Sequence, residues 1–254
     1  MTQQKNIKLI LAYDGTHYQG WQRGSEGKSI EETLEKTLSL ICQHPVVLQA
    51  ASRTDAGVHA EGQVVNFFST KELAPSQLSW SLNQLLPKDL AVIQVEFAND
   101  SFHPTLDSIS KEYRYYICNS PHQLPHHRLY SWHVYQRLNF DSIDAGMQLL
   151  QGKHDFSSFC NHHINQNYVD HIREIFSFER IALPDKRHCF IVRGNHFLYR
   201  MVRNLVGTLI DIGRGKIALE ELSHILKARD RTCAGVSAPA HGLFLHQISY
   251  KNIQ

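Results

Sequence analysis

The first hundred residues alternate between two hydrophobic periods, and this alternation restricts the fold more than any other feature of the chain. Apolar residues at every second position predict strands, whereas apolar residues three and four positions apart predict amphipathic helices. The predicted elements are, in order, a strand at 7–12, a helix at 29–42, strands at 46–50 and 63–69, a helix that Pro75 opens and Pro87 ends, and a strand at 91–97. This β-α-β-β-α-β order is that of the ferredoxin-like unit.

The second half of the chain has a similar pattern with additions. Strands are predicted at 112–118, 131–135, 172–180, 188–194 and 243–250, and helices from Asp141 to about Leu150, at 198–212 and at 219–228. We therefore expect an α+β protein with two ferredoxin-like (RRM-like) halves related by pseudo-symmetry, residues 1–102 and 103–254. Each half should be an antiparallel sheet with helices on one face. This fold carries many unrelated functions, so it does not name one.

Composition excludes several classes of protein. Apolar residues make up 42% and charged residues 20% of the 254 residues, which is ordinary globular usage. A net charge of +2 is too small to indicate a nucleic-acid partner by itself. The five cysteines form no Cys-x-x-Cys pair, which favours reduced thiols in a reducing compartment. Residues 1–10 lack the pattern of a signal peptide, and no apolar run has membrane-spanning length, so we expect a cytoplasmic protein without a membrane partner.

The most distinctive segment is Ser52 to His59, a polar connection between two predicted strands. Asp55 follows Arg53 by two residues, and a charge-assisted bond from that guanidinium would hold the carboxylate ionised. Gly57 permits a backbone turn, and His59 is a candidate donor. On the residue types alone, an ordinary surface turn with a solvated arginine is the simpler interpretation.

The string R-T-D-A-G-V-H over residues 53–59 resembles the active-site signature of the tRNA pseudouridine synthase A family, without a gap. Further stretches are similar to the same family in the same order: 13–15, Tyr18, 20–22, 62–65, Phe67, Asn83, 86–87, 102–103, 111–115, 154–156, 158–159, 197–204, 238–240 and 242–243. The chain departs from the family pattern at Ser237, where threonine is usual, and at Glu31, where glutamine is usual. Residues 161–168 follow no pattern of the family.

The resemblance implies an enzyme, an isomerase that converts uridine to pseudouridine at positions 38, 39 and 40 of the tRNA anticodon stem-loop. The N1–C1′ bond breaks, the uracil rotates, and the base is rejoined through C5. No cofactor is expected. The family also implies a homodimer that binds tRNA across both subunits, with the active site in the cleft between the two halves.

Site residues are carried over by position. Asp55 matches the catalytic aspartate, and Arg53 matches the arginine that pairs with it and helps hold the flipped nucleotide. Tyr113 matches the ring that stacks on the target base, although a half-buried strand aromatic is the simpler interpretation of its residue type. Either Leu243 or Leu245 matches an apolar wall of the pocket. Covalent attack by the carboxylate and removal of a sugar proton both remain open.

Contacts with RNA are predicted from one helix and two connections. Arg200, Arg203 and Asn204 should share one face of the helix at 198–212, with Arg203 also counted as a substrate-binding residue. The loop with Trp21 and Arg23 and the later Arg231 are further candidates. Other basic residues would extend this surface: Arg193, Arg214, Lys216 and Arg229. An ordinary solvated face with ion pairs along the helix is the alternative.

Three rival functions are weighed against the isomerase. A non-catalytic RNA-binding module of the same fold should lack the loop aspartate or Tyr113, yet both are present. A glycoside hydrolase needs paired carboxylates, and only Glu61 lies near Asp55 in the sequence. A zinc enzyme would use Cys160 and His162, but their spacing is poor and no second pair follows, so no metal is expected.

Overall fold

A computed structural model describes residues 4–24, 27–162 and 168–251. It has a mixed α+β fold, which confirms the predicted class. The chain divides into two compact units, called here unit 1 (Met1–Ile109 with Phe244–Gln254) and unit 2 (Ser110–Leu243). In the described part of the chain, no helix is both long enough and apolar enough to cross a membrane.

Unit 1 contains the β-α-β-β-α-β order predicted from the sequence. Its elements are β1 (Lys5–Tyr13), α1 (Ile30–Cys42), β2 (Gln49–Ala50), β3 (His59–Ser69), α2 (Pro75–Leu85) and β4 (Leu90–Phe97). The sheet order is β4-β1-β3, with β2 on the outer edge of β3, and these neighbours are antiparallel. That order is the one expected of a ferredoxin-like unit.

Both helices of unit 1 begin as their sequences predict. The Ser29 hydroxyl accepts a hydrogen bond from the Glu32 N–H at 3.2 Å, which satisfies a donor that the first turn of α1 leaves open. Pro75 stands in the first turn of α2, where its missing N–H costs nothing. Each helix buries its apolar stripe in the core, which includes Leu34 and Leu38 of α1 and Leu78 and Leu82 of α2.

The last strand, β10 (Leu243–Tyr250), lies mostly in unit 1. Phe244 and Leu245 pair in parallel with His59 and Ala60 at the start of β3, and the Tyr250 hydroxyl donates to the carbonyl of Pro104 at 2.8 Å. Among the described residues, 103–109 and 244–251 group with the N-terminal unit, whereas the sequence predicts one division between residues 102 and 103. The pairing of β10 with β3 adds a short parallel pair to the antiparallel strands of unit 1.

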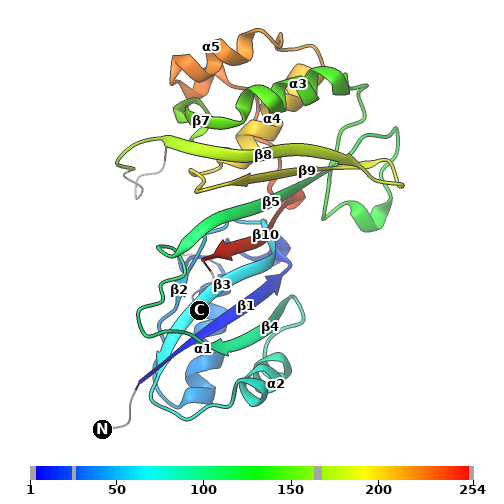
Figure 1. Cartoon of the computed structure of the whole chain (residues 1–254). Coiled ribbons are helices and arrows are strands. Elements are labelled where there is room, and N and C mark those ends of the chain that lie inside the picture. The colour runs from blue at the N-terminus through cyan, green and yellow to red at the C-terminus, as the bar shows by residue number, and fades with distance from the viewer. Residues whose placement is uncertain (1–3, 25–26, 163–167, 252–254) are drawn as a thin grey trace. The chain divides into compact units, whose positions relative to one another are not determined.

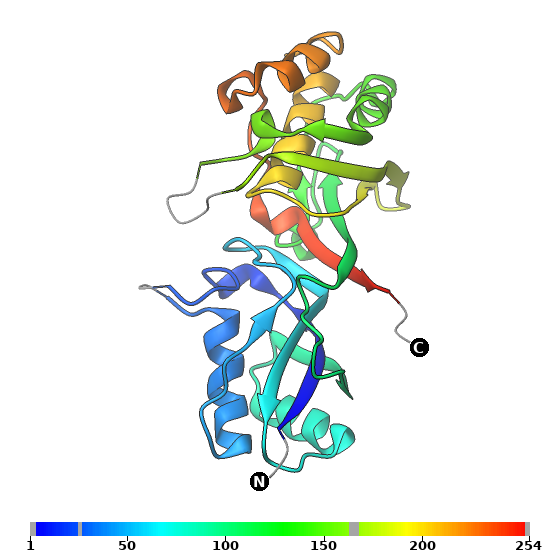
Figure 2. The same cartoon turned by 60° about the vertical axis from the view of Figure 1, so that its left-hand side comes forward.

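Unit 2 has a second sheet and the remaining helices. Its elements are β5 (Ser108–Cys118), β6 (Trp132–His133), α3 (Phe140–Leu150), β7 (Gly152–Asp155), β8 (Ile172–Ala182), β9 (Arg187–Gly194), α4 (Met201–Gly213) and α5 (Glu221–Ala228). The order β5-β9-β8-β7 is antiparallel throughout, and β6 adds to β5 in parallel. The three helices gather on one side of β8 and β9 (Figure 1, Figure 2).

Short 3-10 turns join several of these elements. They are η1 (Gly15–His17), η2 (Pro125–His127), η3 (Ser157–Phe159), η4 (Arg231–Cys233) and η5 (Ala240–Gly242).

The elements differ from the prediction at several places, of which three have a clear physical reason. Asn139, rather than Asp141, caps α3, because its side chain accepts the Ser142 N–H at 3.2 Å. Helix α4 begins at Met201 rather than Leu198, because Arg200 adopts a left-handed conformation with φ of 60°. Strand β7 was not predicted, since its four residues, Gly-Lys-His-Asp, have no apolar alternation.

Candidate active site

Residues 52–58, called here the Asp55 loop, connect β2 to β3 in unit 1. Asp55 is half-buried. The backbone around it is held from the connection after β1: the Trp21 N–H donates to the Thr54 carbonyl at 3.0 Å, and the Gly57 N–H donates to the Tyr18 carbonyl at 3.3 Å. Within the loop, the Val58 N–H donates to the Asp55 carbonyl at 3.1 Å. The carboxylate is therefore displayed from a fixed turn.

Two glycines allow the connection after β1 to approach the Asp55 loop this closely. A Cβ on Gly20, whose φ is +94°, would lie 2.7 Å from the Thr54 carbonyl oxygen. A Cβ on Gly15 would lie 2.0 Å from the Val58 carbonyl oxygen. Both distances are shorter than a carbon–oxygen contact allows, so only glycine fits. The sequence placed Gly15 in the turn after the first strand and both glycines in stretches that resemble the family, but did not predict their contact with the Asp55 loop.

Trp21 is buried, with 1% of its surface exposed, which corrects its prediction as an RNA contact. Its ring lies 6.4 Å from that of Tyr13, between centroids. Burial of the large apolar indole in the core is more favourable than its exposure to water. The backbone N–H of Trp21 holds the Asp55 loop through its hydrogen bond to the Thr54 carbonyl.

Arg23, by contrast, is exposed. Its guanidinium forms an ion pair with Glu35 at 2.7 Å, and its N–H donates to the Glu31 carboxylate at 2.8 Å. Glu31, one of the two departures from the family pattern, thus holds the backbone of a residue that remains a candidate RNA contact.

Arg53, the residue predicted to pair with Asp55, is exposed. Water screens a surface ion pair, so such a pair would stabilise the loop only weakly. The pairing of Arg53 with Asp55 stays a prediction.

His59 is a structural residue rather than the predicted donor to a substrate. It is 1% exposed, and its ring stacks on that of Phe244 with centroids 4.5 Å apart. Its Nδ1 accepts the Gly15 N–H at 3.1 Å and lies 3.2 Å from an Asp14 carboxylate oxygen. Only a protonated Nδ1 would make the second contact an ion pair, and the Gly15 bond requires an unprotonated one. We take Nδ1 as the acceptor.

The predicted stacking residue, Tyr113, lies on β5 in unit 2 and is 7% exposed. Its ring meets that of Phe197 edge to face, with centroids 5.1 Å apart and planes at 82°. Tyr115, two residues along the same face, is fully buried and donates to the Pro239 carbonyl at 2.8 Å. Burial raises the pKa of Tyr115 well above its usual value. Tyr115 is therefore a core residue, and Tyr113 is the more accessible of the two.

The start of α4 holds a buried polar network centred on Asn204, which has no exposed surface. Its amide donates to the Phe159 carbonyl and to Asn161 Oδ1, both at 2.8 Å. Its Oδ1 accepts from Arg231 at 3.0 Å and from the Ser237 hydroxyl at 2.5 Å. Asn204 was predicted to contact RNA, but its side chain is buried and its polar atoms form hydrogen bonds within the protein. The hydroxyl of Ser237 supplies the bond that the usual threonine would also offer.

Among the predicted basic contacts, Arg200 and Arg203 are only partly buried, whereas Arg231 is built into the network. Arg231 donates to Asn204 and to the Gly235 carbonyl at 2.9 Å, and burial, followed by the positive charge of Arg200, lowers its pKa. Arg203 donates to the Ala238 carbonyl at 2.8 Å. The Arg200 guanidinium lies over the Tyr199 ring at 5.1 Å.

The wider basic surface is partly neutralised by acidic neighbours. Arg193 pairs with Glu112 at 2.7 Å, Arg214 and Lys216 each approach Asp211 at 3.5 Å, and Arg229 pairs with Asp155 at 2.9 Å. Leu243 and Leu245 are both buried, at 6% and 0% exposure, so the choice of an apolar pocket wall stays a prediction for both.

No metal site is evident in the residues that the structure describes, where no group of three or more histidine, cysteine or carboxylate side chains converges. Cys160 is buried, and its thiol contacts the Asn161 carbonyl at 3.4 Å. All five cysteines are free thiols.

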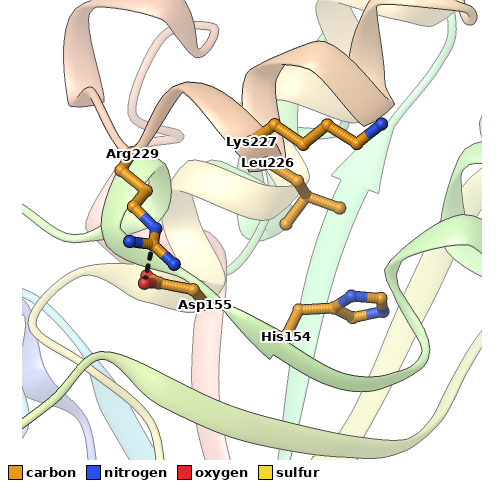
Figure 3. A pocket seen from close by; sticks show the side chains of 5 residues that line it. All are labelled: His154, Asp155, Leu226, Lys227 and Arg229. Atoms are coloured by element: carbon orange, nitrogen blue, oxygen red, sulfur yellow. Dashed lines mark ion pairs between the residues drawn. The ribbon is translucent and has the colours of Figure 1, made fainter.

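A pocket of about 320 Å³ lies at the end of α5 in unit 2, lined by His154, Asp155, Leu226, Lys227 and Arg229 (Figure 3). Three of its polar groups are already engaged, because Arg229 pairs with Asp155 and a His154 ring nitrogen lies 2.8 Å from the Gln151 carbonyl oxygen. Near the same end of α5 in the sequence, the Ser158 hydroxyl donates to the Ile225 carbonyl and accepts the Asp230 N–H. These bonds fasten the end of α5 to the rest of unit 2.

Comparison with known proteins identifies the family. A family model described as tRNA pseudouridine synthase matches residues 9–105 and 147–251. Proteins named tRNA pseudouridine synthase A are similar over nearly the whole chain. One from Exiguobacterium sp. is 39% identical, covering 98% of this chain and 99% of its own, and one from Chlamydia trachomatis is 40% identical, covering 97% and 92%.

A protein named tRNA pseudouridine synthase A 2, from Protochlamydia amoebophila, is 51% identical over 247 residues, covering 97% of this chain and 94% of its own. Among solved structures, a chain of a Cbf5–Nop10–Gar1 complex matches 80% of this chain and 45% of its own, with a TM-score of 0.36 and 12% identity. That likeness is too low to support an argument. The sequence relatives and the family model suffice: this chain belongs to the tRNA pseudouridine synthase family.

Proposed function

We propose that this chain isomerises uridine to pseudouridine at positions 38, 39 and 40 of the tRNA anticodon stem-loop, with Asp55 as the catalytic carboxylate. One observation carries the proposal: Asp55 lies half-buried in a turn that neighbouring backbone holds in place, within an unbroken family signature. Membership of the family supports the reaction class.

The reaction suits a single carboxylate. The N1–C1′ bond breaks and a C5–C1′ bond forms, while the proton on C5 is lost and N1 gains one, so substrate and product are isomers. Asp55 can attack covalently or remove a sugar proton, and both routes require the carboxylate itself. No further reactant enters the balance, and we expect no cofactor.

The other site residues are assigned to holding the RNA. The uracil must leave its stack, which costs a few kcal/mol in nucleic-acid enzymes generally, and stacking on Tyr113 would offset part of that cost. The exposed Arg53 is assigned to a phosphate of the flipped nucleotide. Arg23, Arg200 and Arg203 would add phosphate contacts, and Leu243 or Leu245 an apolar wall.

Product mapping tests the choice of site. Transcripts of one tRNA that keep a uridine at position 38, 39 or 40 alone are incubated with the enzyme, and pseudouridine is detected as a carbodiimide adduct that stops primer extension. We expect a stop at each of the three positions with the wild type and none with Asp55→Asn. Stops only outside these positions would contradict the substrate assignment.

A non-catalytic RNA-binding module is the second candidate, and it predicts tRNA binding without any stop. No structural feature favours it, because the loop aspartate and Tyr113 are both present.

We also propose that the enzyme works as a homodimer in the cytoplasm. The free thiols of the five cysteines support a reducing compartment. Sedimentation equilibrium should give twice the 29.2 kDa of one chain, and a mass of one chain at micromolar concentration would contradict the dimer.

A further inference from the structure

Three buried side chains in unit 1 form one hydrogen-bonded cluster that includes the residue before Asp55. Tyr13 ends β1, Thr54 precedes Asp55, and Gln63 lies on β3; they are 5%, 8% and 0% exposed. The Tyr13 and Thr54 hydroxyl oxygens are 2.8 Å apart, and Gln63 Nε2 lies 3.4 Å from the Tyr13 hydroxyl. We call these three residues the Gln63 cluster.

Where the Asp55 loop leaves the sheet, the side chain of Gln63 forms the hydrogen bonds that main-chain groups form earlier along β2 and β3. Ala50 still pairs with Val65, and the Ala51 N–H donates to the Val64 carbonyl at 2.9 Å. At Ser52 the partner becomes a side chain: Gln63 Nε2 donates to the Ser52 carbonyl at 2.6 Å, and the Ser52 N–H donates to Gln63 Oε1 at 3.3 Å. The Gln63 side-chain amide thus forms the same donor and acceptor pair with Ser52 that a backbone peptide group would form, at the point where the chain leaves the sheet.

The Gln63 amide nitrogen joins the two parts of the cluster. It carries two hydrogens, of which one is donated to the Ser52 carbonyl and the other to the Tyr13 hydroxyl. The Tyr13 and Thr54 hydroxyls share the remaining hydrogen bond, in which either can donate. The cluster therefore holds the backbone of Ser52 and the side chain of Thr54, the two residues on either side of Arg53.

These contacts bear directly on the carboxylate. The Gln63 cluster holds Thr54 by its side chain, while the Trp21 N–H holds its carbonyl at 3.0 Å. Asp55 is the next residue, so its Cα has little freedom to move. A buried polar cluster of this kind is costly to leave incomplete, because a buried donor or acceptor without a partner loses its hydration with no bond in return.

We propose that Tyr13 and Gln63 are positioning residues, which act through Thr54 and Ser52 to hold Asp55 in its reactive orientation. This inference rests on the proposed function, because it presumes that Asp55 reacts. Catalysis is sensitive to such placement: a shift of about 1 Å at a reacting group can cost roughly 100-fold in rate.

The test compares Tyr13→Phe, Thr54→Val and the double variant by single-turnover release of tritium from C5-labelled tRNA at saturating enzyme. We expect each single variant to be slowed roughly tenfold and the double variant by much less than the product of the two factors, because both changes remove the hydrogen bond that Tyr13 and Thr54 share. The Kd for tRNA should stay at the wild-type value, since neither side chain is exposed. A Gln63→Leu variant should be slowed more, because it removes both arms of the cluster.

Tyr250→Phe is the matched control. It also removes a hydroxyl of a tyrosine in unit 1, the one bonded to the Pro104 carbonyl at 2.8 Å, and should leave the rate unchanged. Wild-type rates for Tyr13→Phe and Thr54→Val, or slowing equal to that of Tyr250→Phe, would overturn the positioning role. Asp55→Asn is run in parallel: if it retains activity, the proposed function fails instead.

Discussion

Gly20 has a backbone conformation that side chains rarely adopt, and it faces the residue before Asp55. Its φ is +94°, and an added Cβ would lie 2.7 Å from the Thr54 carbonyl oxygen. We predict that Gly20→Ala destabilises the protein by at least about 1 kcal/mol and slows uridine isomerisation roughly tenfold, because the Asp55 loop must shift. Urea unfolding and tritium release measure the two effects.

Gly215 provides the control for that prediction. Its φ is +72°, but a Cβ there would meet nothing within 4 Å. Gly215→Ala should therefore show a similar backbone strain with a wild-type rate. Equal rates for the two alanine variants would show that the contact of Gly20 with Thr54 has no catalytic consequence.

Lys111 predicts a pH dependence of stability. Burial lowers its pKa to about 8 in the folded protein, whereas the unfolded value is about 10.4. Between these two values the unfolded chain binds more protons than the folded one, so stability rises with pH in that window. Below about pH 8 both states are protonated, and the cost of burying the charge is constant and largest.

We therefore expect the free energy of unfolding of the wild type to rise relative to Lys111→Met by up to about 1.4 kcal/mol per pH unit between about pH 8 and about pH 10. Urea titrations at several pH values measure it. Parallel curves for the two proteins over that window would show that Lys111 keeps an ordinary pKa.

The family motif identified the candidate catalytic loop but not its surroundings. Asp55 stands out through a contiguous motif, which a sequence displays directly. The burial of Trp21 was not predicted, because burial depends on contacts made by distant segments. The bond from Trp21 to Thr54 joins residues that no local pattern relates. The Gln63 cluster was missed for the same reason, since its members come from β1, the Asp55 loop and β3.

The first turn of helix α4 also could not be predicted from the local sequence alone. The apolar period predicted the helix and its buried stripe, but Arg200 is left-handed and the helix begins only at Met201. Asn204, one turn further on, was placed on a polar face by residue type. It is buried because the segments with Phe159, Arg231 and Ser237 fold over it. A buried polar residue with four hydrogen-bond partners cannot be told from an exposed one by its spacing.

The burial of Asn204 predicts a loss of stability when its side chain is removed. Asn204→Ala should lower the free energy of unfolding by about 3 kcal/mol, because it orphans several buried groups. The folded variant should still bind tRNA with the wild-type Kd. Asn139→Ala, which removes only the cap of α3, should cost about 1 kcal/mol. A weaker tRNA complex with unchanged stability would restore Asn204 as an RNA contact.

Across the chain, the order of strands and helices other than β7 was predictable because these elements have a clear hydrophobic period. The partner of β10 was not, since the pattern of a strand does not say which edge it joins. In the structure β10 pairs with the start of β3, directly after the Asp55 loop. The last strand therefore supports the segment that carries the candidate catalytic residue, although the two are far apart in the sequence.

Release of tritium tests the central claim most directly, because C5 loses its hydrogen whenever it becomes bonded to C1′. An unmodified tRNA labelled at uracil C5 is incubated with the wild type and with Asp55→Asn. We predict that the wild type releases the label into water over many turnovers and that Asp55→Asn, which still binds the tRNA, releases none. Release by Asp55→Asn at the wild-type rate, or no release by either protein, would contradict the assignment of Asp55.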